Sequence, residues 1–161
     1  MYSQASLDAI EMQERIYQFD SSFGHEEAMH LGMRLAEAAA RVPKGMAFRI
    51  ILEDLTVFQY FMPGTRLLNN NWMDRKMHLV QRTHEPSLKW AILHELRGPQ
   101  EPWEENEFYY AFVGGAFPIK TDGCYRGMVI VSGLPDSLDH RLLTQVLSEY
   151  LNQEFIPIPT C

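Results

Sequence analysis

Apolar residues recur at intervals of three and four along much of the chain, a spacing that predicts helices. The second helical stretch shows it most clearly, because Leu31, Leu35, Ala39 and Val42 share one face. The helices predicted in this way cover residues 5–18, 24–42, 87–97 and 136–153, with a further helix that runs to about residue 84.

Hydrogen-bond acceptors precede three of the predicted helices, where they can cap the first free N–H groups. Ser22 precedes the second helix, and Asp136 stands at the start of the last. The helix that ends near residue 84 follows Asn69, Asn70 and Asn71, and each of these is a candidate cap.

Alternating apolar positions and runs of β-branched and aromatic residues predict strands. Only Asp54 and Leu55 separate the first two strands, which predicts a hairpin, and Asp122-Gly123 is a strong turn signal before the last strand. In the acidic loop at residues 98–107, prolines argue against a helix. The predicted strands are residues 47–53, 56–62, 108–113, 117–121 and 125–132.

Strand hairpins with helices between them predict an α+β fold, in which a five-stranded, mostly antiparallel sheet is flanked by helices. The elements do not alternate strand by helix, so a parallel Rossmann sheet fits poorly. The chain has 161 residues without a linker, a repeat or a low-complexity segment, and we expect one domain over residues 1–161.

Composition excludes several classes of function. The chain has 14 Lys and Arg residues against 21 Asp and Glu residues, a formal net charge of −7, whereas general nucleic-acid binding needs a basic face. No apolar run approaches the roughly 20 residues that span a bilayer, and the first residues lack the features of a signal peptide. Cys124 and Cys161 form no CxxC pair and are expected to be reduced thiols. These features predict a cytoplasmic protein with neither a nucleic-acid nor a membrane partner.

A basic patch stands out in this acidic chain, and it consists of Arg75, Lys76, His78, Arg82 and His84. Arg75 and Lys76 lie in the first turns of a predicted helix, where free N–H groups and the helix dipole favour an anion. Two cations at that helix end therefore invite an external carboxylate or phosphate. The alternative is that these charges are solvated or bind the acidic loop.

Two short segments could also carry chemistry. Gly114 and Gly115 could let the backbone approach a ligand, although two glycines also suit a β-bulge. Asp139 beside His140 could orient a general base. The plainer interpretation is that Asp139 completes a helix N-terminus and that His140 packs beside a strand end.

Histidine spacing gives no metal site. His25 and His30 are five residues apart, and His78 and His84 are six apart, so neither pair stacks on a helix as residues four apart would. The motifs HExxH, GxSxG and the Walker loop do not occur. We predict no metal site and assign no catalytic residue, while a single haem-ligating histidine stays open.

Three ordered motifs resemble those of a known family. The first, Gly64-Thr65 with Asn69, Trp72 and Arg75-Lys76, follows the pattern GTxxxNxxWxxRK, and the later two are Gly114 to Ile119 and Val131 to Pro135, which leads into Asp139-His140. Over about residues 23–155, the chain resembles the uncharacterised branch of the haem-degrading-domain superfamily, whose relatives include the GlcG and HbpS-like proteins.

The resemblance implies a single domain of profilin-like architecture that assembles into homo-oligomers built from dimers. It also implies that some relatives bind haem or take part in its breakdown, which makes haem a candidate cofactor. The ligand-binding candidates that it transfers to this chain are Asn69, Trp72, Arg75, Lys76, Gly114, Gly115, Asp139 and His140.

Together these residues predict an anion-recognising cleft. Arg75 and Lys76 would hold a carboxylate or phosphate, Trp72 would form an apolar wall, and His140 would make a hydrogen bond. We therefore expect a protein that binds a small anionic ligand or haem. The alternatives are a haem-degrading enzyme and a non-catalytic oligomeric scaffold or regulator.

Overall fold

The computed structural model describes all residues, 1–161. Helices and strands follow one another in the order α1 (Gln4–Ile16), α2 (His25–Ala39), β1 (Ala47–Leu52), β2 (Leu55–Phe61), α3 (Leu67–Thr83), α4 (Ser87–Arg97), β3 (Ala116–Thr121), β4 (Cys124–Ser132) and α5 (Asp136–Tyr150). A short 3-10 helix, η1 (Pro102–Glu105), interrupts the loop between α4 and β3.

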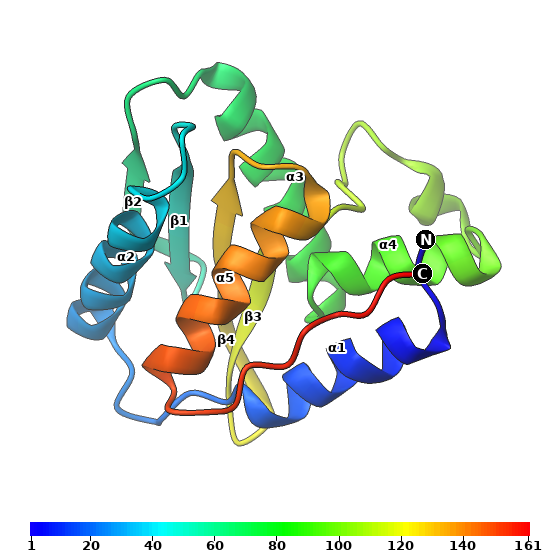
Figure 1. Cartoon of the computed structure of the whole chain (residues 1–161), viewed down its shortest axis with the longest axis horizontal. Coiled ribbons are helices and arrows are strands. Elements are labelled where there is room, and N and C mark those ends of the chain that lie inside the picture. Colours follow the sequence, from blue (N-terminus) through cyan, green and yellow to red (C-terminus); the bar gives the residue numbers. More distant parts are fainter.

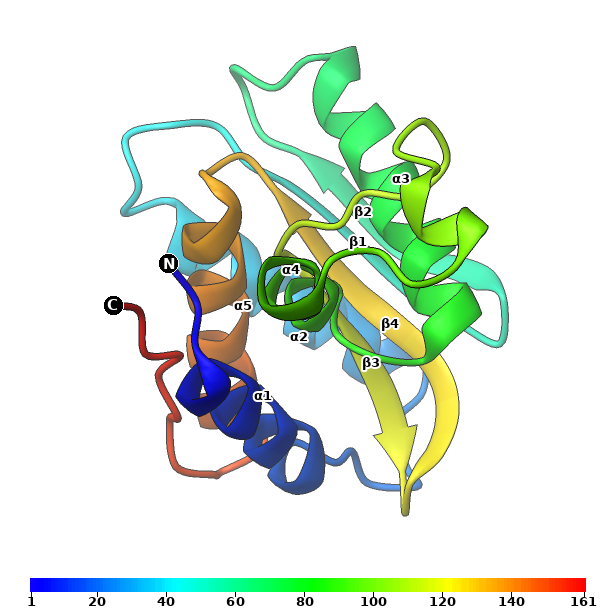
Figure 2. The same ribbon diagram turned by 90° about the vertical axis from the view of Figure 1, so that its right-hand side faces the viewer.

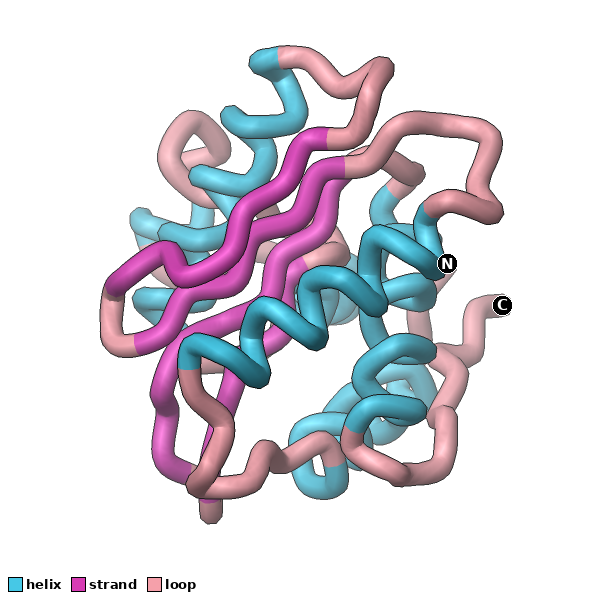
Figure 3. Tube along the Cα trace, turned by 90° about the vertical axis from the view of Figure 1, so that its left-hand side faces the viewer, coloured by secondary structure: helices cyan, strands magenta, loops and turns pink.

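The strands form one antiparallel sheet in the order β2-β1-β4-β3 (Figure 1, Figure 3). The predicted α+β class and both hairpins are confirmed. The predicted number of strands is wrong, because the sheet has four strands and not five. The two hairpins, β1–β2 and β3–β4, are joined by the pairing of β1 with β4 in the middle of the sheet.

Residues 108–113 account for the missing strand. Tyr110 and Phe112 turn their rings onto other rings: the centroid of Tyr110 lies 5.4 Å from that of Trp103, and the centroid of Phe112 lies 4.4 Å from that of His94. An aromatic run has the composition of a strand, but here its rings pack on η1 and α4. Within this loop, Pro102 begins η1, which corrects the expectation that prolines exclude a helix, because proline suits the first helical position.

Two apolar layers enclose the sheet. Helices α2 and α5 cover one face, and α3 covers the other (Figure 1, Figure 2). Leu35 of α2 and Leu147 of α5 belong to the larger cluster, which also contains Phe48 and Val129 of the central strands. Neighbouring strand residues point to opposite faces, so Ala47, Ile51, Met128 and Ile130 pack instead with Met73 and Val80 of α3.

Helices α1 and α4 pack on each other through Ile10, Leu88 and Ile92. The two chain ends meet beside them, where the Cys161 N–H donates to the Met1 carbonyl at 2.9 Å (Figure 1). No helix combines the length and the apolar character needed to cross a membrane.

The predicted helix caps are wrong in detail. Gly24 precedes α2, not Ser22, and the Glu27 carboxylate accepts the Gly24 N–H at 3.0 Å. Helix α3 begins at Leu67, so the three asparagines lie inside it, and Asn69 accepts the Arg66 N–H at 2.9 Å from the first turn. Helix α5 begins at Asp136 as predicted, but the N-cap position is Pro135 and not Asp136.

Candidate functional site

A cleft of about 590 Å³ lies between the first half of α3 and the start of α5. Several segments that are distant in sequence form it, namely α3, the residues before β3, the β4–α5 connection and two loops at the rim. Its lining comprises Lys44, Gly64, Arg66, Leu68, Asn69, Trp72, Lys76, Val113, Gly114, Ser132, Gly133, Leu134, Pro135, Asp136 and Asp139.

A buried ion pair forms the floor of this cleft. The Lys76 ammonium donates to a carboxylate oxygen of Asp139 at 3.1 Å and to the Val131 carbonyl at 2.8 Å. Each of the two charged side chains is only 3% exposed. The pair therefore ties α3 to β4 and α5, and the positive charge of Lys76 is already compensated within the protein.

Burial shifts both groups of this pair toward their neutral forms. It lowers the pKa of Lys76, although the nearby Asp139 carboxylate opposes that shift. It raises the pKa of Asp139, against the attraction of Lys76 and the hydrogen bond from the Leu134 N–H. Desolvation disfavours a charge of either sign, and the ion pair offsets part of that penalty.

The first turn of α5 adds a second carboxylate. Asp136 accepts the N–H of Gly114, and burial raises the pKa of Asp136. Asp139 accepts the N–H of Leu134 at 2.8 Å, which ties the β4–α5 connection to the first turn of α5. The floor thus holds two carboxylates and one ammonium, and it is not the free cationic surface that the sequence predicted.

The double glycine lets the protein pack closely against itself. Gly115 has a φ of +120°, and a Cβ there would lie 2.5 Å from the Lys76 ammonium and 2.7 Å from the Val131 carbonyl. A Cβ on Gly114 would lie 2.5 Å from the Asp136 carbonyl. The space that a side chain would need is filled by α3 and α5, so the glycines create room for the buried pair.

The wall and rim differ from the floor. Leu68, Trp72 and Leu134 bring apolar surface to the cleft. Asn69 holds the start of α3 and approaches the Ser132 hydroxyl at 3.4 Å. At the rim, Lys44 and Arg66 are exposed, and neither belongs to an ion pair.

Of the predicted site residues, Asn69, Trp72, Lys76, Gly114 and Asp139 line this cleft together. Gly115 lies directly behind the Lys76 ammonium. Arg75 and His140 do not belong to the lining.

Arg75 faces away from the cleft. Its guanidinium stacks on the Trp72 ring at 4.6 Å and donates to the backbone carbonyls of Glu107 and Tyr110. The Ala111 N–H donates back to the Arg75 carbonyl at 3.2 Å. The alternative interpretation of the basic patch therefore fits better for Arg75, which holds the acidic loop on α3 through backbone contacts and not through a carboxylate.

His140 faces α1. Its ring is 1% exposed, and Nε2 lies 2.8 Å from the Gln13 side-chain oxygen. The Gln13 amide nitrogen donates to the Ile156 carbonyl, so the oxygen faces the ring and His140 Nε2 carries the hydrogen. Burial lowers the pKa of His140 to about 3. Here too the plainer interpretation holds, because the imidazole is a neutral, buried packing partner.

Sequence reasoning missed the rim cations and Leu134. Arg66 stands inside the GTxxxNxxWxxRK motif at a variable position, and Lys44 lies in a turn far away in sequence. Neither has a local pattern that marks it as functional. The fold brings these side chains together, because the turn before β1, the loop after β2 and the connection after β4 all line the cleft.

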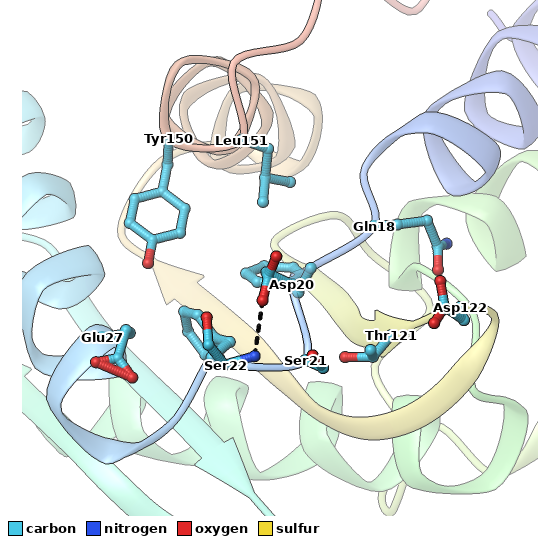
Figure 4. A pocket seen from close by; sticks show the side chains of 11 residues that line it. Gln18, Asp20, Ser21, Ser22, Glu27, Thr121, Asp122, Tyr150 and Leu151 are labelled. Carbon is cyan, nitrogen blue, oxygen red and sulfur yellow. Dashed lines mark hydrogen bonds between the residues drawn. The ribbon is translucent and has the colours of Figure 1, made fainter.

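A second hollow, of about 540 Å³, lies at the α1–α2 connection and the end of α5 (Figure 4). Two of its three acidic side chains already have structural partners: Asp20 accepts the Ser22 N–H at 2.8 Å, and Glu27 accepts that of Gly24. No predicted site residue lines it. The cleft between α3 and α5 is therefore the better candidate site.

Comparison with known proteins agrees with this fold. A family model described as haem degrading protein HbpS-like matches residues 23–148. A UPF0303 protein of Serratia proteamaculans is 37% identical over 90% of this chain and 91% of its own length.

Two solved structures share the fold. The Ybr137w protein is similar with a TM-score of 0.82 and 25% identity, over 92% of this chain and 89% of that one. A PduOC:heme complex is similar with a TM-score of 0.69 and 15% identity, over 86% of this chain and 99% of that one. With a family model that spans most of the chain and a relative that aligns over nearly its full length, the chain belongs to the HbpS-like family.

Proposed function

We propose that the protein binds a small organic anion with a flat apolar part in the cleft between α3 and α5. The main support for this proposal is that the cleft has an apolar wall and a rim with two exposed cations. A volume of about 590 Å³ lies within the range of roughly 300–1,000 Å³ that is common for small-molecule sites. Lys44 and Arg66 would hold the anionic group, and Trp72 would lie against the apolar part.

The floor supports binding better than catalysis. Lys76 and Asp139 are the obvious acid–base pair, but they bond to each other and to backbone groups. A lysine used in this way is a structural link between α3 and α5, and nothing in its geometry favours a haem-degrading reaction. Assembly into homo-oligomers built from dimers and a cytoplasmic location remain predictions.

Haem, which the family name suggests, does not fit the cleft as an iron-ligated group. Haem iron is usually held by histidine, cysteine, methionine or tyrosine. None of these residue types lines the cleft. His140, the histidine that the sequence placed there, is buried on the side of α1 and bonded to Gln13. Lys44 and Arg66 suit the carboxylates of many small molecules, so the proposal names an organic anion and not haem.

The proposal can be tested with 8-anilino-1-naphthalenesulfonate, a flat aromatic sulfonate whose fluorescence rises on binding. We expect the Lys44→Ala/Arg66→Ala double variant to bind it about 5- to 30-fold more weakly, since two rim contacts contribute roughly 1–2 kcal/mol together. Arg15→Ala is a control for the loss of an exposed cation away from the cleft, because Arg15 is an exposed arginine at the end of α1. Equal weakening in the control would contradict a site at the rim.

Two adjacent leucines give a control for the apolar wall. Leu68 lines the cleft and is 63% exposed, whereas Leu67 is 73% exposed and does not line it. Leu68→Ala should weaken probe binding several-fold, by about 1 kcal/mol, and Leu67→Ala should not. Titration with haemin covers the alternative ligand, because a Soret shift that survives Lys44→Ala/Arg66→Ala would favour haem at another place. If neither probe binds saturably, the result would favour the alternative that the protein is a non-catalytic oligomeric scaffold or regulator.

A further inference from the structure

A third cavity, of about 200 Å³, lies between the start of α5 and the C-terminal segment, residues 154–161. This segment follows α5 and returns along α1 (Figure 1). Side chains of α1 hold its backbone in place: the Tyr17 hydroxyl donates to the Glu154 carbonyl at 2.9 Å, and the Gln13 amide donates to the Ile156 carbonyl at 2.6 Å. The C-terminal segment is therefore a fixed wall of the cavity.

Apolar side chains from three elements line this cavity. Leu88 comes from α4, Leu138 from α5, and Ile156 and Ile158 from the C-terminal segment. The charged residue of the lining, Arg141, is exposed to solvent. An apolar cavity of about 150 Å³ in another protein is large enough to hold benzene. The size and the uncharged inner wall therefore suit one neutral aromatic ring.

His140 gives this wall a hydrogen-bond acceptor. Its ring lines the cavity and is 1% exposed. Because Nε2 donates to the Gln13 side-chain oxygen, Nδ1 of the neutral ring carries a lone pair. Nδ1 is buried and has no hydrogen-bond partner among the groups of the protein. A buried acceptor that lacks a donor costs free energy, so a molecule that brings one donor into the cavity would gain from bonding to it.

We propose that this cavity is a second binding site, for a small neutral aromatic molecule of the phenol class. Its hydroxyl would donate to Nδ1 of His140, and its ring would lie against Leu88 and Ile156. The site is separate from the cleft between α3 and α5, because no residue lines both. The inference therefore goes beyond the proposed function and does not depend on it.

The first test uses the unmodified chain and therefore does not depend on the folding of any variant. Phenol is the probe, and benzene is its matched control because it has the ring without the donor. Nitrogen-15 and backbone NMR spectra are recorded during titration over millimolar concentrations. We expect saturable shifts of the Leu138, Thr144 and Ile156 amides with both molecules. The Nδ1 resonance of His140, which responds to a hydrogen bond at its lone pair, should shift with phenol much more than with benzene.

Variants test the cavity and the acceptor separately. Ser137 and Gln145 are both exposed on α5, but only Ser137 lines the cavity. Ser137→Trp should obstruct the cavity and weaken phenol binding roughly tenfold or more, whereas Gln145→Trp should leave it unchanged. His140→Gln keeps an amide N–H that can reach Gln13 but has no acceptor in place of Nδ1. In His140→Gln, phenol should lose about five- to tenfold more affinity than benzene.

Three results would overturn the proposal. The first is a titration in which the Leu138 and Ile156 amides do not shift saturably, which would mean that the cavity takes only solvent. The second is saturable binding that leaves the His140 Nδ1 resonance unchanged, and the third is equal binding of phenol by Ser137→Trp and the unmodified chain. Lys44→Ala/Arg66→Ala should bind phenol as the unmodified chain does, so this site and the cleft between α3 and α5 can fail independently.

Discussion

Breaking the buried pair at the floor of the cleft should be costly, and its two halves should respond to pH in opposite directions. Lys76 and Asp139 are each 3% exposed, with their charged atoms 3.1 Å apart. Removing one partner of a buried pair leaves an uncompensated charge and typically costs about 3–5 kcal/mol. We expect Lys76→Met and Asp139→Asn each to lower the free energy of unfolding by about that amount at pH 7.

The double variant measures the coupling within the pair. Asparagine at 139 keeps an oxygen for the Leu134 N–H, and methionine at 76 keeps the volume of the lysine stem. With both charges gone, no lone charge stays buried, so the double variant should cost at least about 2 kcal/mol less than the two single losses combined. Urea unfolding, followed by tryptophan fluorescence and circular dichroism, provides the free energies.

The pH dependence separates an ion pair from simple packing. Burial raises the pKa of Asp139, so in Lys76→Met the lone carboxylate can take up a proton and the deficit in stability should shrink as pH falls below 7. Burial lowers the pKa of Lys76, so in Asp139→Asn the lone ammonium can lose its proton and the deficit should shrink as pH rises above 7. Losses below 1 kcal/mol, or the same pH trend in both single variants, would refute the reasoning.

Three further predictions concern glycine, glutamate and histidine. Gly115→Ala should lower the free energy of unfolding by over ~2 kcal/mol, because its Cβ would meet the Lys76 ammonium. Gly123→Ala, with open space around it, should show only the backbone cost of about 1 kcal/mol. Equal losses of stability in thermal or urea unfolding would contradict the packing role of Gly115. Burial favours the neutral form of Glu104, but hydrogen bonds from Arg97 and two backbone N–H groups outweigh it and hold its pKa at about 2. The stability that the Glu104 carboxylate contributes is present above about pH 4.5 and should be lost as pH falls toward 2. In urea unfolding, Glu104→Gln should therefore lose less stability over that pH range than the unmodified chain. Burial lowers the pKa of His140 to about 3, so its imidazole should show no titration by NMR between pH 5 and 8. The free energy of unfolding should fall as pH drops from about 6.5 toward 3, because only the unfolded chain then takes up a proton on this histidine. A titration midpoint near 6.5 in the folded protein would contradict the burial of His140.

Local pattern was enough to predict most of the fold. The hairpin of β1 and β2 follows from alternating apolar residues with a two-residue separation, and the stripe of α5 follows from helical spacing. The strand expected at residues 108–113 failed for a physical reason. A run of apolar and aromatic residues indicates side chains that need burial, but it does not indicate what buries them. Tyr110 and Phe112 are packed against Trp103 and His94 and not within a sheet, and the sequence alone does not reveal these partners.

The site was half predictable for a related reason. Neighbouring residues on a helix point about 100° apart, so Arg75 and Lys76 need not both face the cleft, and the same holds for Asp139 and His140. One member of each pair lines the cleft, and the other holds a separate part of the fold. Which member faces inward depends on how α3 and α5 lie on the sheet, and that is a tertiary property.

The most direct test of the proposed function is a map of where an anionic aromatic molecule binds. Backbone NMR spectra recorded during titration with 8-anilino-1-naphthalenesulfonate provide that map. We predict saturable shifts at Asn69, Gly114, Gly133 and the Trp72 indole, with residues 18–27 unchanged. Shifts centred on residues 18–27, or scattered shifts that do not saturate, would contradict a binding site between α3 and α5.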